Sequence, residues 1–175
     1  EEIRMLRENR EHLTKLPGVP LPADMEFTTD MERALTGREL LVMAKASPYV
    51  RATCRKLAQL IPKGQLIVNV AKGIGADTLM TMTDIISQEI PLANVAVLSG
   101  PSHAEEVGRG LPTTIVAGAK DRETALFVQN TFMSPVFRVY TSPDILGIEL
   151  GGSLKNVIAL AAGTADGLGY GDNTK

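Results

Sequence analysis

Five short runs of apolar, largely β-branched residues alternate with longer stretches whose apolar residues recur at helical spacing. The runs cover residues 40–44, 66–70, 95–99, 113–117 and 136–140, and the helical stretches cover 49–60, 78–90 and 122–132. Strands that are apolar on both faces and alternate with helices are typical of a sheet covered on both sides. The sequence therefore predicts an α/β protein with a mostly parallel sheet.

After Tyr140 the pattern changes. Ser142-Pro143-Asp144 predicts the start of a helix with proline in its first turn, and about twenty helical residues lead into a glycine-rich end without a further strand. We predict a boundary near residue 141, with part of a sheet domain at 1–141 and the start of a helical domain at 142–175. The proline-rich segment 16–22 predicts a stiff loop rather than a regular element. Both ends of the sequence look cut, which suggests a fragment of a longer protein.

Composition excludes several function classes. The 175 residues carry a net charge of −2 and 44% hydrophobic residues, which permits one good core and gives no electrostatic footprint for nucleic acid. We see no signal peptide, no apolar run approaching the ~20 residues of a membrane span, and no metal site. The lone Cys54 fits a reducing compartment, and we interpret it as a small packing residue.

Lys155 is the only charged residue on a predicted helix face whose other residues are mostly small. Gly151, Gly152, Ala159 and Ala162 share the face of Lys155. Each interior glycine costs a helix roughly 1 kcal/mol relative to alanine, so close approach of another backbone or of a ligand is expected to compensate. Tight helix packing beside a snorkelling lysine is the alternative.

Polar residues also follow two of the predicted strands, where open parallel sheets bind ligands. Lys72 emerges from the run 66–70 between small residues, either as a site residue or as a surface lysine in a glycine turn. Beyond the run 95–99, Ser102 and Glu105 match a capping box, and free N–H groups at such a helix start can also bind an anion. His103 is expected at the helix start rather than as a base.

These segments carry a family resemblance. The chain resembles the NAD(P)-dependent glycerol-3-phosphate dehydrogenases of the bacterial, soluble type, in family order and at family spacing. The matching segments are 16–19 with 21–22, 71–74, 98–107, 137–140, 149–159, 166–169 and 171–175. The resemblance implies a partial doubly wound, Rossmann-like sheet followed by the start of an all-helical domain. It also implies hydride transfer between NADH or NADPH and dihydroxyacetone phosphate, giving sn-glycerol 3-phosphate.

The resemblance carries roles onto six positions. It implies Lys155 as the catalytic residue, substrate contacts at Lys72, Gly100, Ser102, Lys155 and Asn156, and cofactor contacts at Lys72 and Ala104. A positioned ammonium can stabilise the alkoxide that forms from the carbonyl and can deliver its proton. The resemblance further implies a cytoplasmic enzyme of phospholipid synthesis and a homodimer when full length.

The chain also departs from the family pattern. It begins after the family's glycine-rich pyrophosphate turn and ends before an Arg-Asn pair and an Asp that serve the substrate, so we expect this chain alone to be inactive. Lys45 stands where the family usually has a Val-Pro-Ser turn, and Gly75 replaces a Glu. Two other interpretations stay open: a related two-domain hydroxy-acid dehydrogenase and a non-catalytic, truncated binding module.

Overall fold

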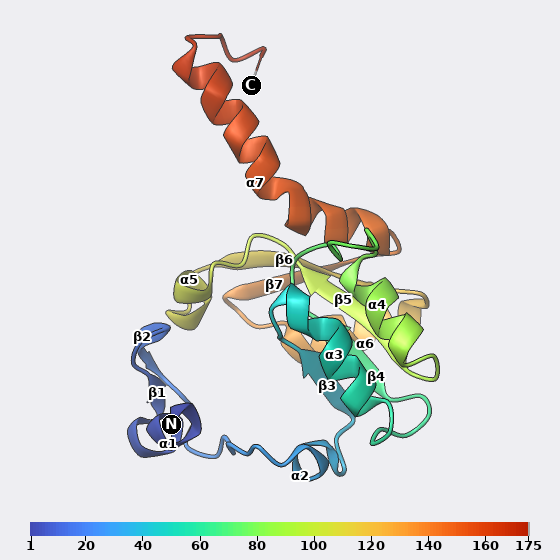
Figure 1. The fold of residues 1–175 in the computed structure, drawn as a ribbon. Coiled ribbons are helices and arrows are strands. Elements are labelled where there is room, and N and C mark those ends of the chain that lie inside the picture. Colours follow the sequence, from blue (N-terminus) through green and yellow to red (C-terminus); the bar gives the residue numbers. More distant parts are fainter. Residues whose placement is uncertain (175) are drawn as a thin grey trace.

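The computed structural model describes residues 1–174, and Figure 1 shows how its elements are arranged. In chain order the elements are α1 (Glu2–Asn9), β1 (Glu11–His12), β2 (Leu16–Pro20), α2 (Met31–Leu35), β3 (Leu40–Met43), α3 (Ser47–Leu57), β4 (Leu66–Asn69), α4 (Met82–Glu89), β5 (Asn94–Ser99), α5 (Ala104–Gly108), β6 (Thr113–Ala119), α6 (Arg122–Phe132), β7 (Phe137–Ser142) and α7 (Ile145–Gly167). The five predicted strands are therefore present, each displaced by two residues at most.

The main sheet has the order β3-β4-β5-β6-β7, and its last two strands, β6 and β7, run opposite to the first three. β3, β4 and β5 are mutually parallel, β6 is antiparallel to β5, and β7 is parallel to β6. The prediction of a mostly parallel sheet is confirmed. The carboxyl ends of β4 and β5 consequently meet at one edge of the sheet.

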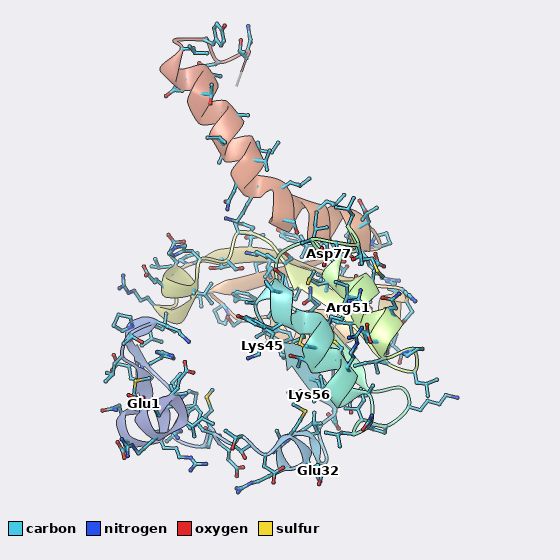
Figure 2. All side chains as sticks on the ribbon, viewed as in Figure 1. Glu1, Glu32, Lys45, Arg51, Lys56 and Asp77 are labelled. Atoms are coloured by element: carbon cyan, nitrogen blue, oxygen red, sulfur yellow. The ribbon has the colours of Figure 1, made fainter. Side chains whose placement is uncertain are left out.

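Alternating side chains of the strands supply two cores. Ile67 and Val95 face α3 and α4, whereas Val68 and Ala96 face α6. Cys54 is completely buried in the first core, as the packing interpretation required. On the same side, Arg51 of α3 points toward α4 in Figure 2 and pairs with Glu89, which also binds Arg55 at 3.1 Å.

Two helices are shorter than predicted. α4 begins at Met82 rather than at residue 78, because the Thr81 hydroxyl accepts a hydrogen bond from the amide of Asp84 and so caps the helix. Leu79, just before it, has a φ of +54° and is largely exposed. α3 ends at Leu57 rather than at residue 60, and Leu60 is exposed. α6 has the predicted bounds.

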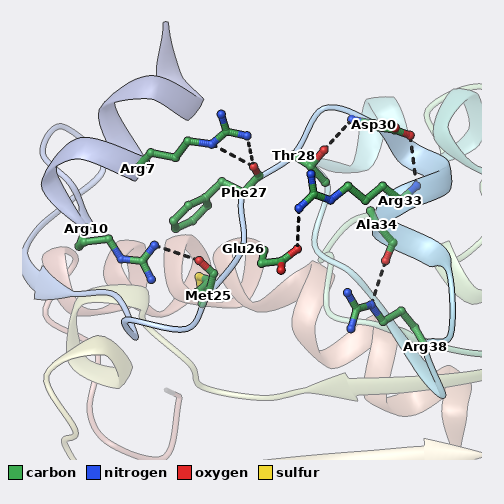
Figure 3. A network of polar contacts seen from close by, with 10 residues as sticks. All are labelled: Arg7, Arg10, Met25, Glu26, Phe27, Thr28, Asp30, Arg33, Ala34 and Arg38. Atoms are coloured by element: carbon green, nitrogen blue, oxygen red, sulfur yellow. Dashed lines mark hydrogen bonds and ion pairs between the residues drawn. The ribbon is translucent and has the colours of Figure 1, made fainter.

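The segment 16–22 corrects another expectation. Leu16–Pro20 forms strand β2, which pairs antiparallel with β1 in a small separate ribbon. The extended φ that prolines favour suits an edge strand as well as a loop, so prolines alone could not exclude pairing. The irregular chain that follows is held to α1 by arginines in Figure 3, where Arg7 donates to the carbonyl of Phe27 and Arg10 to that of Met25.

α7 fulfils the prediction of a long helix after the sheet. It begins at Ile145, so Pro143 precedes the helix rather than standing in its first turn, because Asp144 is the cap and accepts a hydrogen bond from the amide of Gly147 at 2.8 Å. Figure 1 shows α7 beginning against the sheet and then extending away from it. The last residue of the predicted helical domain, Lys175, lies outside the described residues.

α7 also revises the expectation about apolar length. It is 23 residues long and contains an 18-residue window with a mean hydropathy of 1.4, so within residues 1–174 one helix could cross a membrane by length and composition. A single such helix is weak evidence for a span, although only 6% of this window is buried. Because the buried Glu149 of α7 is hydrogen-bonded to other elements of the fold, a membrane span is not indicated.

Candidate active site

Lys72 lies in the loop that leaves β4 and reaches the end of β5. Its ammonium donates to the carbonyl oxygen of Gly100 at 2.8 Å and to the hydroxyl of Ser102 at 3.1 Å. Both acceptors are neutral, and the lysine is half-buried. Lys72, Gly100 and Ser102, three of the predicted site residues, are thus brought together at the carboxyl ends of β4 and β5.

The capping box predicted at Ser102 is wrong. His103 occupies the cap position of α5, as expected for it, and makes no side-chain capping bond. The Ser102 hydroxyl instead donates to the carbonyl of Gly100 at 3.3 Å while it accepts from Lys72. Because that hydroxyl is hydrogen-bonded to Lys72 and Gly100, it contributes to the candidate site and does not cap α5. Ala104 is the exposed first residue of α5.

Glycines bring the backbone of this site close to its neighbours. A β-carbon at Gly152 would stand 2.6 Å from the Ser99 hydroxyl oxygen and 3.6 Å from the side chain of Lys72. At Gly100 a β-carbon would stand 3.1 Å from the Cα of Ile115. The predicted close approach therefore applies to Gly152. It does not apply to Gly151, which has open space around it.

Lys155 lies on α7 one turn beyond Gly152. Its side chain is exposed, and its ammonium donates to the Asn156 side-chain oxygen at 3.0 Å. Burial lowers the pKa of Lys72 from its ordinary value, and the positive charge of Lys155 lowers this pKa further. The two lysines are therefore close enough to repel each other, and an anion between them would relieve that repulsion.

The departures at positions 45 and 75 have different structural settings. Lys45 is exposed just after the edge strand β3, as Figure 2 shows. Gly75 is tightly enclosed, because a β-carbon there would stand 2.7 Å from the Thr78 hydroxyl and 3.3 Å from Ile85. A glutamate at position 75 would therefore require a different local conformation.

Four residues that sequence reasoning did not single out support this site. Glu149 of α7 is 5% exposed, and its carboxylate accepts hydrogen bonds from Thr83 and Asn69. The Ser153 hydroxyl accepts from the amide of Gly73 at 3.0 Å. The available signal was a lone acidic residue in the otherwise apolar first turns of α7, with a serine four positions later on the same face.

The fold and the site together define a class of protein. A doubly wound sheet with a lysine-bearing site at the carboxyl ends of its parallel strands is the Rossmann-type arrangement. Residues 1–125 match the family model of the NAD-dependent glycerol-3-phosphate dehydrogenase N-terminus, and residues 144–175 match that of its C-terminus. The chain belongs to the NAD-dependent glycerol-3-phosphate dehydrogenase family.

Named relatives agree with this membership. The chain is 63% identical to glycerol-3-phosphate dehydrogenase [NAD(P)+] of Agathobacter rectalis, over 99% of this chain and 52% of the relative. It is 55% identical to the protein of the same name from Fusobacterium nucleatum, over 100% of this chain and 53% of the relative. The crystal structure of glycerol-3-phosphate dehydrogenase from Coxiella burnetii superposes with a TM-score of 0.87 at 27% identity, covering 98% of this chain and 53% of that one. The chain thus spans about half the length of the curated relatives it matches.

Proposed function

We propose that the complete protein reduces dihydroxyacetone phosphate to sn-glycerol 3-phosphate with NADH or NADPH, and also catalyses the reverse reaction. The observation that carries the proposal is the placement of Lys72 against Gly100 and Ser102 at the carboxyl ends of β4 and β5, where the charge of Lys155 on α7 acts on it. Two neighbouring cations suit a substrate with a phosphate and an oxygen that becomes negative. The relatives' names supply the substrate and the cofactor.

The strand-end residues also fit a nicotinamide cofactor. Ala104 is exposed at the start of α5, and Lys72 supplies a positive charge beside Gly100. We assign cofactor contacts to Lys72 and Ala104. When bound, the reduced cofactor supplies the hydride that the carbonyl carbon receives.

In the proposed reaction, residues of this chain bind the substrate, stabilise its developing charge and transfer the proton. Lys155 stabilises the negative charge that develops on the carbonyl oxygen and donates the proton to it, while Asn156 orients the ammonium through its hydrogen bond. Lys72, fixed by Gly100 and Ser102, holds the substrate's negative charge. In the reverse direction the neutral amine of Lys155 accepts the proton from the alcohol.

We extend the proposal to the organisation of the protein. Residues 1–141 would form part of the dinucleotide-binding domain, and residues 142–175 would begin the helical substrate domain. We place the complete protein in the cytoplasm as a homodimer that supplies phospholipid synthesis. What supports the boundary is the change at Ser142 from strands to one long helix.

The experiment compares Lys155→Ala with Lys63→Ala, an exposed loop lysine, in the complete protein. We expect kcat to fall at least ~100-fold in the first variant and to stay unchanged in the second, with both folded by circular dichroism. Near-normal turnover of Lys155→Ala would remove Lys155 from the mechanism. A panel of 2-oxo acids as substrates tests the alternative of a hydroxy-acid dehydrogenase. The alternative of a non-catalytic binding module predicts that the wild type shows no turnover, and calorimetry with cofactor and substrate then measures whether it binds them.

A further inference from the structure

Glu149 is a buried carboxylate whose hydrogen-bond partners come from two other elements. One oxygen accepts from the backbone amide of Thr83 at 3.0 Å and from the side-chain amide of Asn69 at 3.4 Å. The other oxygen accepts from the Thr83 hydroxyl. All these donors are neutral, so the charge is held by hydrogen bonds rather than by a cation.

The position of Thr83 suits a negative charge. Thr83 is the second residue of α4, so its amide is one of the four that no helical carbonyl can satisfy. The start of a helix also carries a partial positive charge. Glu149 therefore caps α4 from a different helix, and this contact fixes α7 against α4.

Asn69 connects Glu149 to the loop that carries Lys72. It is completely buried at the end of β4, where its side-chain amide donates to the carbonyl of Ala71 at 2.9 Å and its oxygen accepts from the amide of Ala71 at 3.1 Å. Glu149 thus binds the residue that shapes the turn immediately before Lys72.

Ser153, one helical turn after Glu149, binds the other side of that turn. Its hydroxyl accepts from the amide of Gly73 at 3.0 Å and donates to the carbonyl of Glu149 at 2.8 Å. The backbone on both sides of Lys72 is therefore tied to α7, directly through Ser153 and through Asn69 to Glu149. The same helix carries Lys155 six positions after Glu149.

We propose that Glu149 is a positioning residue, which sets the place of Lys72 relative to Lys155 by joining α7 to the end of β4 and the start of α4. The inference rests on the proposed function for its catalytic consequence, but the geometry it describes is independent of any reaction. Glu149 touches neither lysine through its carboxylate contacts, so its effect passes through the Lys72 loop.

The test replaces Glu149 by glutamine in the complete protein, which keeps the size and removes the charge. Glu123→Gln, an exposed carboxylate in the first turn of α6, is the matched control. The first readout is the rate at which an amine-reactive reagent labels Lys72, divided by the rate at the exposed Lys120 in the same sample. Loss of charge-assisted hydrogen bonds is expected to raise this ratio about tenfold through local opening, and Glu123→Gln should leave it unchanged.

The second readout is steady-state kinetics. Misplacement of Lys72 relative to Lys155 is expected to lower kcat about 10- to 100-fold, with a much smaller change in KM for the nicotinamide cofactor. If the wild type shows no reduction of dihydroxyacetone phosphate, the proposed function fails, while the labelling ratio still decides the role of Glu149.

A second variant keeps the proposal falsifiable if Glu149→Gln does not fold. Thr83→Val removes only the hydroxyl that donates to Glu149, and it should move both readouts in the same direction by a smaller amount. The proposal is overturned if a folded variant keeps the wild-type labelling ratio and kcat. It is equally overturned if both variants unfold, or lose stability while the ratio stays constant, because Glu149 would then serve stability alone.

Discussion

Gly152 of α7 and Ser99 of β5 are in such close contact that no side chain fits between them. A β-carbon at position 152 would stand 2.6 Å from the Ser99 hydroxyl oxygen, whereas none of the atoms around the neighbouring Gly151 lies within 4 Å of such a carbon. The Ser99 hydroxyl is buried without a hydrogen-bond partner among the described residues. The contact brings α7 against the sheet at the level of Lys72.

This contact predicts opposite effects for two adjacent alanine substitutions. Gly152→Ala should lower the free energy of unfolding by about 1–3 kcal/mol through overpacking, measured by urea denaturation. Gly151→Ala should raise it by up to about 1 kcal/mol, because alanine favours the helix and the site is open. Adding Ser99→Ala to Gly152→Ala should restore most of the loss, and failure of this rescue would show that the Ser99 hydroxyl is not the obstacle.

The pH dependence of stability should report the setting of Lys72. Burial and then the charge of Lys155 lower its pKa below the ordinary 10.5. As pH rises through this lowered value, the folded protein releases the proton before the unfolded chain does, so stability rises toward pH 10.5. Lys72→Met should lack this rise, and urea denaturation of both proteins at neutral pH and at about pH 10 measures the difference. Parallel pH curves for the two proteins would contradict it.

Cys54 predicts a change of the opposite sign at alkaline pH. Burial raises the pKa of its thiol from 9.0 to about 11, with a smaller contribution from the charge of Glu89. The folded protein keeps the proton after the unfolded chain has lost it, so stability should fall by on the order of 2 kcal/mol between pH 9.0 and about 11. Cys54→Ala should flatten this decline in urea denaturation. Fast alkylation of native Cys54 at pH 8 would show that the thiol is not buried.

The fold was largely predictable because its signals are local. Apolar runs on both faces mark β3 to β7, and the 3.6-residue periodicity of α6 was long enough to define both ends. α4 was predicted too long because its true start depends on the Thr81 cap and on the left-handed backbone at Leu79, neither of which changes the apolar pattern. β2 escaped prediction because its partner, β1, is only two residues long.

Site residues were predictable where their place in the sequence, directly after a buried strand or on one face of a helix, indicates their role. Lys72 and Ser102 were found because they follow buried strands, although the hydroxyl of Ser102 binds Lys72 rather than capping α5. Glu149 and Asn69 could not be found in this way, because their partners lie in distant parts of the chain and only the folded structure brings them together. The distinction between Gly151 and Gly152 likewise requires knowing which side of α7 faces the sheet.

The contacts that anchor α7 to the fold end at Ser153, whose hydroxyl binds the amide of Gly73. From Ser153 the helix extends two residues to Lys155 and fourteen to Gly167, about 3 Å and about 21 Å at 1.5 Å per residue. A swing of about 5° would carry the far tip by about 2 Å but the amine of Lys155 by less than about 1 Å. The part of α7 beyond Lys155 can therefore move appreciably while the amine of Lys155 stays almost still.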